Sequence, residues 1–167
     1  SSLTSALVAG VESRHRRTIS WLLDSMADRP DTLAIPLIEL ILDKAVAADL
    51  KFGTGEQGVL AASQLLDRSP DRFRIRLATA ADDSTEQQLL LLALVQQPAP
   101  ELYETVSEIH RIGLGNADVL ALLVLARDGE TLDPVDVERL KLVAASSTDS
   151  EAVRTQAAWL AVRHTGI

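Results

Sequence analysis

Glutamates at helical spacing come closest to a catalytic pattern in this sequence. Glu101, Glu104 and Glu108 recur at i, i+3 and i+7, which places them on one face of a helix. Paired carboxylates there could serve acid–base chemistry or bind a metal ion. The backbone dipole also favours negative charge in the first turns of a helix, where Glu101 and Glu104 would lie. We therefore expect a solvated acidic face in preference to an active site.

Histidine, cysteine and serine chemistry finds little support. His15, His110 and His164 are the three histidines, and they fall on separate predicted helices. His110 is two residues from Glu108, so their side chains do not share a helix face. The sequence has no cysteine, which excludes disulfides, thiolate metal ligands and a cysteine nucleophile. It also has no Gly-x-Ser-x-Gly nucleophile elbow. We expect no catalytic residue, no cofactor and no metal site.

A glycine pattern resembles a nucleotide-binding loop superficially. Gly53, Gly55 and Gly58 read Gly-x-Gly-x-x-Gly. A dinucleotide site needs this pattern after a strand within a βαβ unit, and a phosphate loop needs Lys followed by Ser or Thr. Neither context is found in the sequence. We interpret these glycines as a turn and the first turn of a helix.

Two basic clusters are the candidate contacts for a partner. Arg14, Arg16 and Arg17 cover most of one turn of the first predicted helix, and Arg72 and Arg76 share a face of a later one. The alternative is a solvated face for the first cluster and intrachain ion pairs for the second. Such pairs contribute little to stability when exposed. The partner-binding hypothesis rests on these five arginines.

The large aromatic side chains are few and allow two interpretations. Trp21, Tyr103 and Trp159 each lie on an apolar helix stripe. Aromatic anchors are common at interface hot spots, but core packing explains a stripe equally well.

Composition favours a helical protein with an acidic surface. Of 167 residues, 47% are hydrophobic and 3% aromatic. The apolar content is mostly Leu, Ala and Val, and Ala and Leu are strong helix formers. The net charge of −8 repels phosphate backbones, so we expect no nucleic-acid binding.

No apolar run approaches the roughly 18 residues of a membrane helix, so we expect a soluble protein without membrane insertion. The chain begins Ser-Ser, from which we expect a processed protein or part of a longer one. The lack of cysteine allows the cytoplasm and equally a periplasmic or secreted protein. We slightly favour the cytoplasm.

Helix-start signals recur at nearly even steps. Thr54, Ser84, Asn116 and Asp149 precede apolar helical runs, at steps of 30, 32 and 33 residues. Gln87 follows Ser84 at capping-box spacing. A step that holds two helices is typical of stacked helix pairs. The helices are expected over residues 2–27, 31–49, 54–66, 70–77, 84–95, 101–112, 117–127, 134–143 and 150–164.

The segment from Arg72 to Leu77 alternates polar and apolar residues, which is a strand pattern. It nevertheless follows a Ser-Pro-Asp helix start, and a lone strand here would have no evident partner. We therefore expect a short helix.

The last predicted helix resembles the second helix of a HEAT-type repeat. Val153, Arg154 and Ala157 match that pattern in order, over about 15 of the 167 residues. The period is shorter than the usual HEAT length and closer to that of tetratricopeptide repeats. The resemblance implies a divergent α-α superhelix that presents a binding surface.

The sequence thus predicts one all-α domain over residues 1–167. We expect a right-handed α-α superhelix of about four helical hairpins, with a compact irregular bundle as the alternative. The expected function is a non-catalytic protein–protein interaction or scaffold module within a larger assembly, because repeat arrays present extended surfaces. The alternative is an enzyme or small-ligand-binding domain with a pocket between helices.

Overall fold

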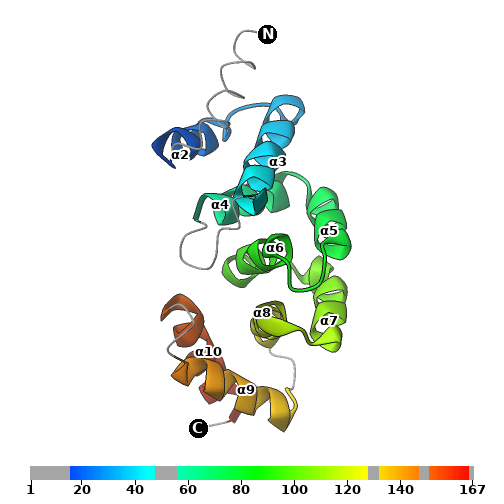
Figure 1. Ribbon diagram of the computed structural model, residues 1–167, viewed down its shortest axis with the longest axis vertical. Helices are drawn as coiled ribbons and strands as arrows, with labels where there is room; N and C mark the ends of the chain where they lie inside the picture. Colours follow the sequence, from blue (N-terminus) through cyan, green and yellow to red (C-terminus); the bar gives the residue numbers. More distant parts are fainter. Residues whose placement is uncertain (1–15, 48–55, 128–131, 147–150, 166–167) are drawn as a thin grey trace. The chain divides into compact units, whose positions relative to one another are not determined.

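The structure is a computed structural model that describes residues 16–47, 56–127, 132–146 and 151–165 (Figure 1). Helices and the turns between them make up these residues, with no strand among them, so the predicted all-α class is confirmed. In chain order the elements are α2 (Arg16–Ser25), α3 (Asp31–Ala47), α4 (Glu56–Arg68), α5 (Pro70–Thr79), α6 (Thr85–Gln96), η1 (Pro100–Leu102), α7 (Tyr103–Ile112), α8 (Gly115–Ala126), α9 (Pro134–Ala145) and α10 (Glu151–Thr165).

The contacts divide the chain into two compact units, residues 1–76 and 77–167. The boundary falls within α5. Each unit is described by itself. No helix in the described ranges is long and apolar enough to cross a membrane.

In the first unit, α4 packs against both α2 and α3. α3 buries one face, on which Leu37, Ile38, Ile41 and Leu42 are each at most 4% exposed. Burying each such side chain contributes about 1.5–3 kcal/mol. The hydrophobic effect therefore holds α3 in place.

Arg68 joins the end of α2 to α4. Its guanidinium donates to the carbonyl oxygens of Met26, Ala27 and Arg29 and forms an ion pair with Asp31 at 2.7 Å. These carbonyl oxygens lie in the turn between α2 and α3, so the guanidinium joins this turn to the end of α4.

The segment with the strand-like alternation is helical, as predicted. α5 buries Phe73 and Leu77, which are four residues apart and completely enclosed. That spacing places both on one helix face. The Ser-Pro-Asp start therefore outweighs the alternating pattern.

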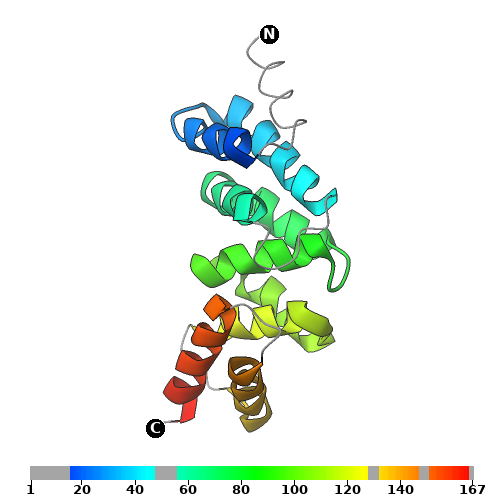
Figure 2. The same ribbon diagram turned by 60° about the vertical axis from the view of Figure 1, so that its left-hand side comes forward.

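In the second unit, α8 is the central helix and packs against α6, α7, α9 and α10. Residues 120–126 of α8 are all buried, and α6 buries Leu89–Leu91 and Ala93–Val95. These runs have no polar face to expose, so neighbouring helices must cover them. α9 and α10 lie side by side as the last pair (Figure 2).

The start of α6 follows the predicted cap in part. Ser84 Oγ accepts a hydrogen bond from the Gln87 backbone N–H at 3.2 Å. The Gln87 side chain accepts from the Asp83 N–H at 2.8 Å rather than from that of Ser84. The reciprocal bond of a capping box is thus shifted by one residue.

The predicted cap of α8 is wrong. Asn116 lies inside the helix, which begins at Gly115 after Leu114, and Leu114 makes no side-chain cap. Instead, Asp83 Oδ1 accepts a hydrogen bond from the Ala117 N–H at 2.9 Å. Asp83, which is distant in the sequence, therefore accepts the hydrogen bond at the start of α8 that Asn116 was expected to accept.

Candidate functional site

The first predicted basic cluster falls where little is described. Arg14 and the side chains of Arg16 and Arg17 lie outside the described residues, and α2 begins at Arg16. Their proposed contact with a partner stays a prediction.

The second cluster takes part in ion pairs between α3 and α5. Arg72 pairs with Glu39 at 3.1 Å and Arg76 with Asp43 at 2.7 Å. Each helix supplies two residues four positions apart, so the two ion pairs lie one helical turn apart along the helices. Arg72 and Arg76 thus have intrachain partners, which is the alternative raised by the sequence.

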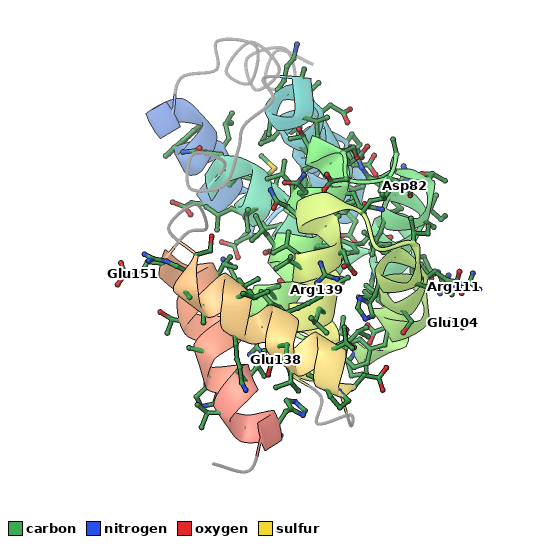
Figure 3. All side chains as sticks on the ribbon, turned by 60° about the horizontal axis from the view of Figure 1, so that its bottom comes forward. Asp82, Glu104, Arg111, Glu138, Arg139 and Glu151 are labelled. Atoms are coloured by element: carbon green, nitrogen blue, oxygen red, sulfur yellow. The ribbon has the colours of Figure 1, made fainter. Side chains whose placement is uncertain are left out.

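The glutamates of η1 and α7 are solvated, as expected. Glu101, Glu104 and Glu108 are exposed, and Glu108 pairs with Arg111 three residues later. In Figure 3, Glu104 and Arg111 lie on the outer side of α7, whereas Arg139 lies beside α8. No cluster of three acidic or histidine side chains able to hold a metal occurs in the described ranges.

A polar cluster that the sequence interpretation missed joins α7, α8 and α9. Asp118, in the first turn of α8, is completely buried, and its Oδ1 lies 2.5 Å from His110 Nδ1. Its other oxygen pairs with Arg139 of α9. His110 Nε2 lies 3.4 Å from Asp136 Oδ2, at the start of α9. Four side chains from three helices thus form one cluster.

This cluster is suited to holding helices together. A buried carboxylate is costly unless it is paired and hydrogen-bonded, and Asp118 has both a cation and an imidazole. An imidazole that acts as a general base needs one nitrogen directed at the substrate. Both nitrogens of His110 face carboxylates of the chain itself. The geometry therefore supports a structural role.

The only signal for this cluster in the sequence is Asp118 itself. It is the one charged residue in α8, an otherwise apolar helix. An acidic residue near a helix start also suits the helix dipole, so the sequence does not distinguish a buried ion pair from a simple first-turn preference.

The tryptophans do not pack in the core. Trp21 on α2 is 63% exposed and Trp159 on α10 is 58% exposed, which contradicts the core-packing interpretation for both. Tyr103 is partly buried at the start of α7. Two large aromatic residues therefore face solvent, where they are available as contacts.

Trp159 borders an open cleft of about 480 Å³ in the second unit. Residues from four regions of this unit line it: Pro98, Tyr103, Arg127, Thr155, Gln156, Trp159 and Arg163. A volume of this size lies within the range of ligand sites, which is about 300–1,000 Å³. The exposed tryptophan makes it an open surface feature.

The wall of the cleft formed by α10 is fixed to the end of α8. His164 Nε2 lies 2.9 Å from the carbonyl oxygen of Ala126, and Arg163 donates to that of Arg127 at 3.3 Å. Because a carbonyl only accepts, His164 donates from Nε2. The guanidinium of Arg163 also lies over the Trp159 ring, 5.3 Å from its centroid, within cation–π range. These contacts orient the aromatic wall before any ligand arrives.

The residues matched to a HEAT-type helix behave as a packing face requires. Val153 and Ala157 are buried and Arg154 is partly buried. Its Nε has no hydrogen-bond partner among the described residues. The arrangement fits a helix that packs by its apolar stripe, which many helical proteins share.

No protein-family model, curated protein or solved structure matches this chain. Its function is therefore argued from its own residues.

Proposed function

We propose that this protein is a non-catalytic protein-interaction module whose second unit binds a short segment of a partner protein in the cleft beside Trp159. The observation that carries the proposal is an exposed tryptophan on the wall of a preformed cleft. Tryptophan is among the residues most enriched at interface hot spots.

The shape of the cleft favours a segment of a macromolecule over a small molecule. Small-molecule sites cover 70–90% or more of a drug-sized ligand. Trp159 is more than half exposed, so a small ligand stacked on it would remain largely in water. A peptide segment can cover the ring and continue along the neighbouring surface.

The exposed face of α10 extends this surface. Ala158, Trp159 and Val162 are exposed, and their spacing places them along one side of the helix. An apolar stripe on an exposed helix is a common docking surface for a partner. The consecutive pairs α3 with α4, α7 with α8 and α9 with α10 support a helical-repeat arrangement within each unit. The superhelix remains part of the proposal.

The enzyme alternative has less support. Of the two described histidines, His110 lies in the more polar environment, but the cluster engages both of its nitrogens. Among the described residues that line the cleft there is no carboxylate and no histidine, so these residues offer no acid–base pair.

The proposal is tested by selecting binders from a library of phage-displayed random 12-residue peptides on the 167-residue chain. Trp159→Ala is the test variant and Trp21→Ala is the matched control, because Trp21 is an equally exposed tryptophan in the other unit. We expect selected peptides to bind the chain and the control alike and to lose at least about tenfold in affinity with Trp159→Ala. A library that yields no binder, or binders indifferent to Trp159, would refute the proposal.

A further inference from the structure

The cleft is positively charged on an acidic protein. The chain has a net charge of −8, yet the cleft is lined by Arg127 and Arg163 and by no acidic residue of the described chain. No carboxylate from the described residues pairs with either arginine. The described side chains that line the cleft therefore carry positive charge, opposite in sign to the net charge of the whole sequence.

Arg163 keeps the capacity to bind an anion. A guanidinium has five N–H donors, and the bond to the Arg127 carbonyl uses one of them. The cation–π contact with Trp159 favours this position of the group and does not consume its N–H donors. A fixed planar fork beside an aromatic ring suits a carboxylate, which accepts two parallel hydrogen bonds.

Other ligand classes fit less well. A cation would meet two arginines, and Arg163 already covers one face of the Trp159 ring. A nucleic acid would bring many phosphates to a surface whose net charge is −8, and electrostatic repulsion would oppose this. A ligand with one or two anionic groups beside an apolar group fits both the arginines and the exposed tryptophan ring.

We infer that the segment bound in this cleft is an acidic peptide, in which an apolar side chain packs on Trp159 and a neighbouring Asp or Glu pairs with Arg163 and Arg127. This inference rests on the proposed function, since it names the class of partner for the same cleft. Thr155 and Gln156, which also line the cleft, supply polar groups for the peptide backbone.

Trp159 itself reports binding. The sequence contains two tryptophans, so Trp21→Phe leaves Trp159 as the single one. The probes are the peptides selected above, each synthesised with acetylated and amidated ends. Each is compared with a twin in which every Asp and Glu is replaced by Gln, and with a second twin that carries Lys there. Titration of Trp159 fluorescence gives the Kd for each.

We expect the selected peptides to carry Asp or Glu next to an apolar residue, and their Gln twins to bind at least about tenfold more weakly. Arg127→Gln and the double variant Arg127→Gln/Arg163→Gln should weaken the acidic peptides by a similar factor. The single variant leaves the contacts of Arg163 intact, so it separates loss of charge from loss of the cleft wall. The double variant Arg111→Gln/Lys141→Gln removes the same charge from exposed positions outside the cleft and should leave Kd unchanged.

The possible outcomes distinguish the two proposals. If the Gln or Lys twins bind at Trp159 with the same Kd as the acidic peptides, the acidic-peptide inference is overturned and the proposed function stands. Absence of any peptide binder would remove both. Titrations of Trp159 fluorescence with single-stranded DNA and with inorganic phosphate complete the test. If either binds with a lower Kd than every peptide, the inference is overturned in favour of a phosphate site.

Discussion

Asp83 accepts a hydrogen bond from the backbone N–H of Ala117, 34 residues further along the chain. The bond closes the N-terminus of α8 from outside the helix. Asp83 is itself held in the left-handed region, at φ 57°, by the side chains of Gln87 and Gln88. Aspartate tolerates this conformation better than most residues. The start of α6 and the start of α8 are therefore organised by one residue.

Replacing Asp83 with Ala should destabilise the protein by about 1–2 kcal/mol, the usual cost of losing an N-cap. Asp82→Ala is the control, because Asp82 is the exposed neighbour and should change the free energy of unfolding by less than about 0.5 kcal/mol. Urea denaturation followed by circular dichroism measures both. Equal effects of the two substitutions would contradict the cap.

Gly115→Ala should cost more stability than Gly113→Ala. Both glycines have positive φ, 56° and 74°, so both substitutions strain the backbone. A Cβ at Gly115 would also overlap the Asp83 carboxylate, whereas one at Gly113 meets nothing nearer than a carbonyl oxygen at 3.7 Å. We expect a difference of at least about 1 kcal/mol, as for overpacking.

The Asp83→Ala background tests the cause of that difference. With the carboxylate removed, the excess cost of Gly115→Ala should disappear, and a double-mutant cycle would show the coupling. An excess that persists in this background would mean that the overlap with Asp83 is not its origin.

The cluster around the buried Asp118 should be sensitive to loss of the side chains that pair with this carboxylate. In the double variant His110→Ala/Arg139→Ala, the Asp118 carboxylate loses the side chains that pair with it while it remains in the interior. We expect a loss of about 3 kcal/mol, which is typical of an uncompensated buried charge. Adding Asp118→Asn should recover part of it, because a neutral amide is less costly to bury. Thermal unfolding of the original protein and of the double and triple variants measures their order of stability.

Arg68→Ala should destabilise the first unit by about 2 kcal/mol, since its guanidinium bonds three carbonyl oxygens in the turn after α2. Arg68→Lys should restore only part, because an ammonium lacks the planar fork. The control is Arg74→Ala, whose half-exposed pair with Asp71 should contribute about 0.5 kcal/mol or less. Similar unfolding midpoints for the Arg68 and Arg74 variants would contradict a stabilising role for the bonds between Arg68 and the carbonyl oxygens.

Anionic and cationic quenchers should report the charge around Trp159. In the Trp21→Phe protein, iodide should quench Trp159 more efficiently than caesium does, because Arg127 and Arg163 attract anions to the cleft. The preference should fall with Arg127→Gln/Arg163→Gln and at high salt. Acrylamide, which is neutral, corrects for accessibility. A preference for caesium at Trp159 would mean that the cleft is not positively charged.

The helices and their order follow from the sequence alone. Continuous apolar runs such as Leu89–Val95 predict buried helices, and Ser84 and the Pro70 region mark helix starts that the structure confirms. These features are local, because helix propensity, capping and apolar periodicity depend on residues within one or two turns of each other.

The polar contacts were decided by tertiary structure. Asp83 reaches Ala117, and His110 reaches Asp118 and Asp136, only because α6, α7, α8 and α9 pack at particular rotations. The exposure of Trp159 likewise depends on which side of α10 faces α9 and α8. A helical pattern gives the apolar face of each helix but not the partner that this face meets, since packing of whole surfaces selects it. The sequence therefore determined the elements, and tertiary packing decided the cluster and the cleft.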